Sequence, residues 1–130
     1  MTRTLQFYSK PRRASPEAAL QRAVCEHLRL TARPGVLYFH PTNEGRRSVV
    51  TGANLKRMGM LPGVADLVVI VNGRTSFLEL KATGEKPRDT QLAFAEQALA
   101  AGCDYAVCDN ISDALDMLRC WGAIRRARAA

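Results

Sequence analysis

Two acidic side chains and a lysine in the segment 62–81 are of types that could act together on a phosphate. The segment reads P-G-V-A-D-L-V-V-I-V-N-G-R-T-S-F-L-E-L-K, so that Asp66 precedes an apolar run and Glu79 stands two residues before Lys81. Carboxylate oxygens suit a hard divalent cation, and an ammonium group beside them can meet a phosphate or a water. The residue types therefore predict a divalent-cation site next to a cationic side chain, provided that the chain brings the three groups together.

A β-hairpin is the element that would do so. Residues 67–71 form a continuous apolar run, which is typical of a strand buried on both faces. Asn72-Gly73 follows, and both residues tolerate the positive φ of a type I′ turn. Side chains alternate along the returning strand, 75–81, so Glu79 and Lys81 share one face.

The register of this hairpin decides whether the two acids meet. With a two-residue turn, Val71 pairs with Arg74 and Asp66 lies opposite Glu79. A four-residue loop on the same dipeptide gives the same pairing, whereas a three-residue loop breaks it. Facing acids destabilise a ladder unless a positive charge lies between them. The alternative is a surface hairpin with an exposed Glu79–Lys81 pair, but the apolar neighbours of Glu79 favour a buried site.

Length and charge indicate one domain with basic ends. The chain has 130 residues and a net charge of +7. Eight of its 19 basic residues lie in two segments without acids, 1–13 and 119–130. We expect a domain at 14–122 between basic tails at 1–13 and 123–130. Such tails suit a polyanionic partner, although they could serve solubility alone.

The cysteines and the hydropathy favour a cytoplasmic protein. The four cysteines lack any C-x-x-C spacing, and we interpret them as reduced, mostly core residues. The sequence shows no secretory leader, no apolar run of membrane length and no amphipathic helix in either tail. We therefore expect no membrane partner.

The first half of the chain predicts a helix, a strand and a basic insertion. Ser15 can cap a helix that begins with Pro16-Glu17 and turns one stripe inward: Leu20, Ala23, Val24, His27 and Leu28. Glu17 borders that stripe, although a glutamate also suits a first helical turn for its charge alone. A strand follows at 36–40, with Val36, Tyr38 and His40 on one face.

The insertion carries basic residues beside the predicted sheet. A polar loop begins at Pro41, and a short helix at 51–58 ends before Gly59. We expect this segment to be a lid or a nucleic-acid contact, with a solvated insertion as the alternative. Its candidate phosphate-contacting residues are Asn43, Arg46, Arg47, Lys56 and Arg57.

The second half predicts a loop at 82–89, a helix at 91–101, a strand at 105–108 and a last helix from Ser112 to Gly122. Asp89 or Thr90 would cap the first of these helices, which would turn four residues inward: Leu92, Ala95, Ala98 and Leu99. The order of elements predicts an α/β fold with a mixed central sheet flanked by helices.

The array Asp66-x12-Glu79-x-Lys81 resembles the signature of the PD-(D/E)XK, or restriction-endonuclease-like, nucleases, and the surrounding pattern resembles their VRR-NUC branch. The matching pieces, which span roughly residues 15–108, are Glu17 with Gln21, Asn43-Glu44-Gly45, the stretch 59–67, Glu79-Leu80-Lys81 and Gln91. One departure is Ala65, where many members have a proline. It removes a rigid turn residue and no reactive group. The basic tails are not features of the family.

The resemblance implies a restriction-endonuclease-like core, α-β-β-β-α-β, and a metal-dependent phosphodiesterase. Asp66, Glu79 and the Leu80 carbonyl would bind Mg²⁺ or Mn²⁺, and Glu17 would reach the site directly or through water. Lys81 would orient or deprotonate the attacking water, or offset charge on the phosphate. Gln91 would orient a ligand or the water.

Small members of this branch resemble nucleases that cut branched DNA, including four-way junctions. The resemblance thus implies a phage-type or bacterial endonuclease that acts as a homodimer in the cytoplasm of a bacterium or a phage-infected cell. A non-catalytic DNA-binding module on the same fold is the alternative. It would be expected to lack a ligand or the lysine, and this chain has all of them. A purely structural α/β protein is a third reading, which the facing acids disfavour.

Overall fold

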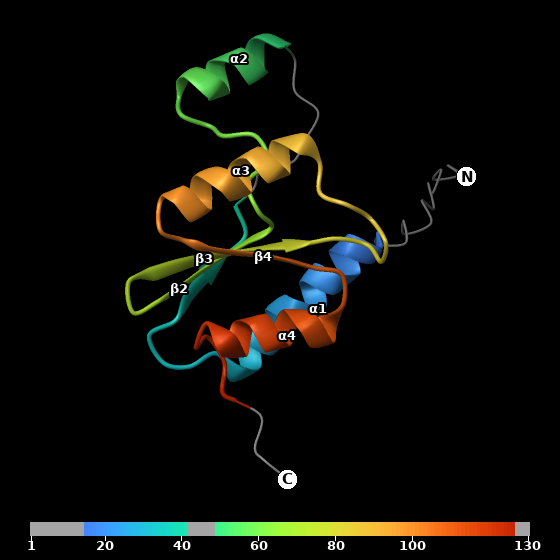
Figure 1. Ribbon diagram of the computed structural model, residues 1–130, viewed down its shortest axis with the longest axis vertical. Coiled ribbons are helices and arrows are strands. Elements are labelled where there is room, and N and C mark those ends of the chain that lie inside the picture. Colours follow the sequence, from blue (N-terminus) through green and yellow to red (C-terminus); the bar gives the residue numbers. More distant parts are fainter. Residues whose placement is uncertain (1–14, 42–48, 127–130) are drawn as a thin grey trace, which may run out of the picture.

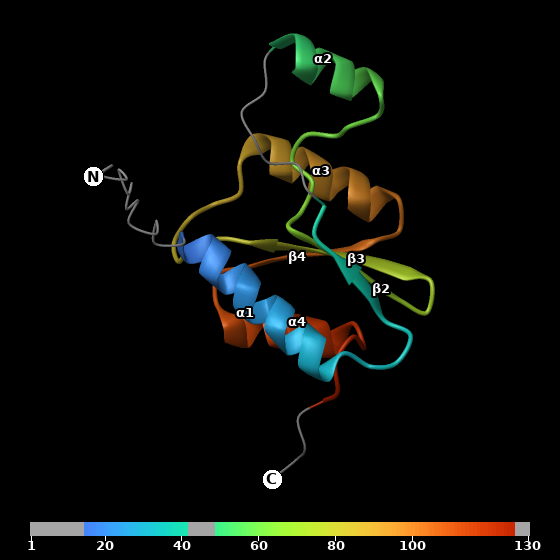
Figure 2. The same cartoon turned by 180° about the vertical axis from the view of Figure 1, so that it is seen from behind.

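The computed structural model describes residues 15–41 and 49–126 and shows a four-stranded mixed sheet with helices on both faces (Figure 1). Along the chain the elements are α1 (Pro16–Thr31), β1 (Leu37–Phe39), α2 (Val49–Arg57), β2 (Leu67–Val71), β3 (Arg74–Leu80), α3 (Asp89–Ala100), β4 (Asp104–Cys108) and α4 (Ile111–Cys120). The strands follow the order β1-β2-β3-β4, and only β3 and β4 are parallel. Helices α1 and α4 lie on one face of the sheet and α3 on the other, as both views show (Figures 1 and 2). The α/β prediction is confirmed.

The hairpin between β2 and β3 has the predicted two-residue turn. Val71 pairs with Arg74. Both turn residues have positive φ, 50° at Asn72 and 77° at Gly73, as a type I′ turn requires. The last pair of the antiparallel ladder joins Leu67 to Leu78. One step further along the same register, the chain brings Asp66 beside Glu79.

The main core lies between the sheet and the helices α1 and α4. Its fully buried side chains come from both helices and from β2 and β3, and the largest are Leu28, Leu67, Leu78, Leu80 and Leu118. Ala123 and Ile124 are also buried in this core, at 0% and 4% exposure. The packed domain thus continues past the boundary expected at residue 122, because the first residues of the expected basic tail are apolar and cover the core.

A smaller core lies under α3, and it corrects the predicted inward face of that helix. Phe94 and Ala98 are buried there, whereas Leu92 and Leu99 are 49% and 58% exposed. The ring of Phe94 meets Phe77 edge-on, with centroids 4.9 Å apart. Aromatic packing on the sheet, and not the spacing of leucines, sets the rotation of α3.

Several local predictions were also wrong. Arg88 occupies the N-cap position of α3, where Asp89 or Thr90 was predicted. Asn110 rather than Ser112 caps α4, because its side chain accepts a hydrogen bond from the Asp113 N–H. His27 is exposed and does not face the core. All four cysteines are free, but Cys120 is exposed. Across the described residues, no helix combines the length and the apolar character that a membrane crossing needs.

Candidate active site

A polar pocket of about 220 Å³ lies at the end of the β2–β3 hairpin, beside the start of α1 and the start of α3. It brings together the five residues that the sequence predicted as catalytic: Glu17, Asp66, Glu79, Lys81 and Gln91. These residues come from α1, the two hairpin strands and their ends, and α3. The other lining residues are His40, Pro41, Gly63, Val64, Ala65, Arg88 and Thr90.

Asp66 is held in place by two hydrogen bonds from different strands. Its Oδ2 accepts from the Leu80 backbone N–H at 2.8 Å, across the end of the hairpin. Its backbone carbonyl lies 2.6 Å from the Nδ1 of His40, at the end of β1. Since a carbonyl only accepts, His40 must carry its proton on Nδ1 in this contact. The second carboxylate oxygen of Asp66 is not used by either bond.

Glu79 is 3% exposed and is positioned by Gln91. The Nε2 of Gln91 donates to Glu79 Oε1 at 2.9 Å, and the Oε1 of Gln91 accepts from the Arg88 backbone N–H at 2.8 Å. Glu79 Oε2 is buried and has no hydrogen-bond partner among the described residues. One oxygen of this buried carboxylate is therefore held by a hydrogen bond, and the other lacks a hydrogen-bond partner in the described part of the chain.

The environment of Glu79 strongly disfavours its charge in the absence of a cation. Burial, followed by the negative charge of Asp66, raises the pKa of Glu79 from 4.5 to about 8. The positive charge of Lys81 opposes this increase but does not cancel it. A buried Glu79 with an unpartnered oxygen among the described residues, beside the half-buried Asp66, is complementary to a cation that binds oxygen ligands.

Glu17 lies near this pair without completing a three-carboxylate cluster. Its Oε1 accepts from the Ala82 backbone N–H at 3.4 Å. It also faces Glu85, because a hydrogen bond and the negative charge from Glu17 raise the pKa of Glu85. Within residues 15–41 and 49–126, no group of three or more His, Cys, Asp and Glu side chains is arranged to hold a metal ion. The geometry thus fits an ion held by Asp66 and Glu79, with Glu17 at the edge of the pocket.

Of the two remaining predicted residues, Lys81 lines the pocket, whereas Leu80 is not among its lining residues. Lys81 is 3% exposed, lines the same pocket and donates its backbone N–H to the Cys108 carbonyl at 2.9 Å. Leu80 is 1% exposed and packs in the main core, between the two charged residues of the pocket. The strand thereby sends alternate side chains to the core and to the pocket, as the period of a β-strand requires.

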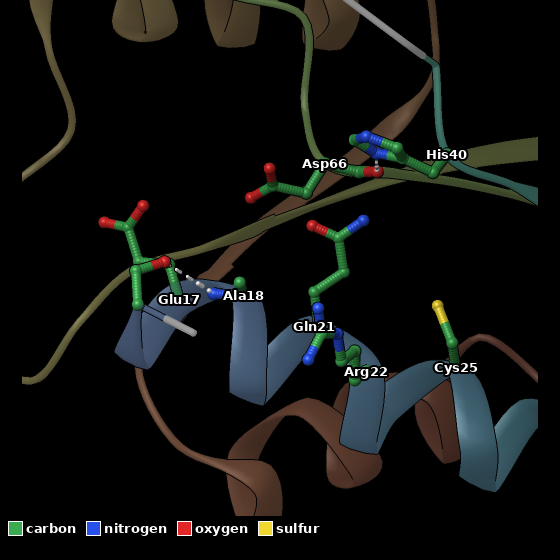
Figure 3. Close-up of a pocket in the computed structure, with 8 residues that line it drawn as sticks. Glu17, Ala18, Gln21, Arg22, Cys25, His40 and Asp66 are labelled. Carbon is green, nitrogen blue, oxygen red and sulfur yellow. Dashed lines mark hydrogen bonds between the residues drawn. The ribbon is translucent and has the colours of Figure 1, made fainter. Parts of the chain in front are cut away.

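A second hollow, of about 340 Å³, adjoins the pocket along α1 and shares Glu17, His40 and Asp66 with it. Figure 3 shows Glu17 and Gln21 on the α1 side of this hollow, with Asp66 and His40 across from them. The sequence predicted no role for His40. It placed this residue on a strand face, but the contact with Asp66 joins segments 26 residues apart, and no local pattern reveals it.

No protein-family model matches the sequence, and no curated protein sequence matches it significantly. Two solved structures are similar. One, described as a "VRR_NUC domain", has a TM-score of 0.57 and 23% sequence identity, and the match covers 82% of this chain and 97% of the other. The second, a "VRR_NUC domain protein", has a TM-score of 0.67 and 18% identity, with 84% and 89% covered. The chain shares the VRR_NUC fold.

In this VRR_NUC fold, the helix α2 carries the described part of the predicted DNA-contacting set. Lys56 and Arg57 are exposed in its last turn. Both views show α2 beyond α3, on the side away from the sheet (Figures 1 and 2). The other predicted DNA contacts, Asn43, Arg46 and Arg47, lie outside the described residues.

Proposed function

We propose that the protein is an endonuclease that requires Mg²⁺ or Mn²⁺ and hydrolyses phosphodiester bonds in branched DNA, such as four-way junctions or flaps. The observation that carries the proposal is the buried Glu79 carboxylate. It has one oxygen without a partner in the described part of the chain, its ionised form is disfavoured by burial and by Asp66, and Lys81 lies in the same pocket. The VRR_NUC fold of the chain is consistent with this chemistry.

The residues that would hold the ion are Asp66, Glu79 and the Leu80 carbonyl, with Glu17 acting directly or through water. All of them offer oxygen, which a hard divalent cation prefers to the nitrogen and sulfur ligands of a zinc site. When bound, such an ion lowers the pKa of its water and offsets the negative charge that builds on a phosphate under attack.

The chain's own residues then have separate roles. Gln91 keeps one Glu79 oxygen occupied, so the other, which has no partner among the described residues, would be the one that binds the ion. His40 and the Leu80 N–H fix the backbone and the carboxylate of Asp66, respectively. Lys81 brings a buried ammonium group to the pocket, where it would orient the attacking water or neutralise phosphate charge.

The proposed preference for branched DNA is based on the kind of contact that the chain offers. Lys56 and Arg57 would contact phosphates, which report the path of the backbone and not the base sequence. A two-fold homodimer would present two pockets to the two strands of a symmetric junction. We propose that the enzyme acts in the cytoplasm of a bacterium or of a phage-infected cell.

The test is the cleavage of a labelled four-way junction, compared with a flap and a linear duplex of the same sequence, with Mg²⁺, with Mn²⁺ and with EDTA. We expect metal-dependent cuts near the branch point and much slower cleavage of the linear duplex. If all three substrates stay intact with either metal while the protein still binds them, a non-catalytic DNA-binding module replaces the nuclease.

A further inference from the structure

A hollow of about 390 Å³ lies at the opposite end of α1 from the catalytic pocket, and its walls carry positive charge. It is lined by His27, Leu30, Thr31, Ala32, Arg119, Ile124 and Arg125. None of these lining residues is acidic. The hollow could therefore receive an anion without facing a carboxylate from its own wall.

The segment after α4 builds one side of this hollow. Ile124 forms an isolated antiparallel bridge with Ala32, and Ala123 accepts a hydrogen bond from the Arg33 N–H at 2.9 Å. Ala123 and Ile124 are buried, so this segment is anchored to the end of α1. The anchor places Arg125 at the hollow, although the sequence alone assigned this arginine to a basic tail.

Arg119 brings a second positive charge to the same hollow. Its Nη1 donates to Asp116 at 3.1 Å, but its Nε is buried and has no partner among the described residues. A side chain that is 31% exposed and lines the hollow can present its charge to an anionic ligand there, whereas the buried Nε cannot reach it.

We propose that this hollow binds a phosphodiester group of the DNA backbone, at a distance from the bond that is cleaved. The proposal rests on the proposed nuclease function and assigns part of the basic C-terminal segment to the same substrate. Glu17 and Thr31 lie at the two sites on one helix, and 14 residues of α-helix span about 21 Å. That is the length of about six base pairs of duplex DNA. The two sites thus hold separate parts of the substrate.

The first experiment measures DNA binding without metal, so that cleavage cannot interfere. The dissociation constant of a labelled four-way junction is measured in EDTA at several salt concentrations, for the parent protein, Arg125→Gln and Arg29→Gln. Arg29 is the matched control, because it is exposed on the last turn of α1 and pairs with Glu26 at 2.6 Å, away from the hollow. Both variants lose one positive charge from the same end of the molecule.

We expect Arg125→Gln to weaken binding by about 3-fold to 10-fold at moderate salt and to reduce the salt slope by about one unit, as the loss of one phosphate contact requires. Arg29→Gln should change both quantities much less. Arg119→Gln removes the second positive charge of the hollow, and it should weaken binding in the same direction. In an ethylation-interference experiment, a modified phosphate about six base pairs from the cut should impair binding of the parent and not of Arg125→Gln.

Equal effects of Arg125→Gln and Arg29→Gln, or no effect of either, would overturn the proposal, since the arginines would then only complement the ends of α1 and α4. Absence of junction binding by the parent protein would also overturn it. Failure of the nuclease proposal looks different: the junction would bind through Arg125 but stay intact with Mg²⁺ or Mn²⁺. Metal-dependent cleavage with unchanged binding by Arg125→Gln would leave the nuclease standing and remove only this second site.

Discussion

Replacing Glu79 by glutamine should make the metal-free protein more stable at alkaline pH. In the unfolded chain this carboxyl titrates near pH 4.5, whereas in the folded protein its pKa is raised to about 8, mainly by burial and by Asp66. Below pH 4.5 both states are protonated and the folded protein has its full stability. As the pH rises toward 8, only the unfolded state releases its proton readily, so the free energy of unfolding falls.

The magnitude follows from the two pKa values. Each unit of difference corresponds to about 1.4 kcal/mol, and because ionisation is only half complete at each of the two pKa values, the loss between pH 4.5 and pH 8 amounts to about 4 kcal/mol. Glutamine cannot ionise and therefore escapes this loss. Its side-chain oxygen still accepts from Gln91, and its NH₂ group can donate to Asp66, which leaves the packing unchanged. We expect Glu79→Gln to resemble the parent at pH 4 and to exceed it by about 2 to 4 kcal/mol at pH 9.

Urea denaturation in EDTA at pH 4, 7 and 9 measures this difference. Glu96→Gln on α3 is the control, because it removes an exposed carboxylate from the same region, and it should shift stability little at any of the three values. A difference between Glu79→Gln and the parent that stays constant from pH 4 to pH 9 would refute the reasoning, since the Glu79 carboxyl would then not be destabilised by its surroundings.

Three further substitutions test other parts of the site. Lys81→Ala should lower the cleavage rate at least about 100-fold and leave junction binding nearly unchanged. Lys86→Ala is the control, because Lys86 is exposed, and it should cleave normally. Parallel losses of binding and cleavage in Lys81→Ala would contradict the role of Lys81. Gln91→Leu should weaken Mn²⁺ binding in calorimetry by about 10-fold, and unchanged affinity would show that Glu79 does not need this support. Gly63→Ala should unfold at lower urea than Gly73→Ala, although both glycines have positive φ. A Cβ at residue 63 would lie 2.2 Å from the Thr90 carbonyl oxygen, whereas no atom of the described residues lies within 4 Å of a Cβ at residue 73. Equal losses would leave only backbone strain as the cause.

The sequence was most informative where local rules determine the structure. Asn72-Gly73 fixes a two-residue turn, and the register of the turn alone brings Asp66 beside Glu79. The cap at Ser15 was also predictable, because its side chain meets the N–H only three residues ahead, at Ala18. These features depend on neighbouring residues and need no knowledge of the tertiary fold.

The predictions failed where distant segments decide the outcome. The leucines of α3 suggested an inward face, but the helix turns Phe94 toward Phe77 of β3. The role of His40 depends on the pairing of β1 with β2, which sets its ring against the Asp66 carbonyl. The anchoring of Ile124 to Ala32 likewise joins the two ends of the domain. None of these contacts leaves a periodic signal in the sequence.

The central claim is that the two acids at the end of the hairpin share one divalent ion. A crystal of the protein soaked in Mn²⁺ tests it most directly, through the anomalous scattering of manganese. We expect a peak between the Asp66 and Glu79 carboxylates that is absent in Asp66→Ala. The account would be contradicted by a peak elsewhere on the protein. It would also be contradicted by the absence of a peak between these carboxylates at a Mn²⁺ concentration that saturates the protein in solution.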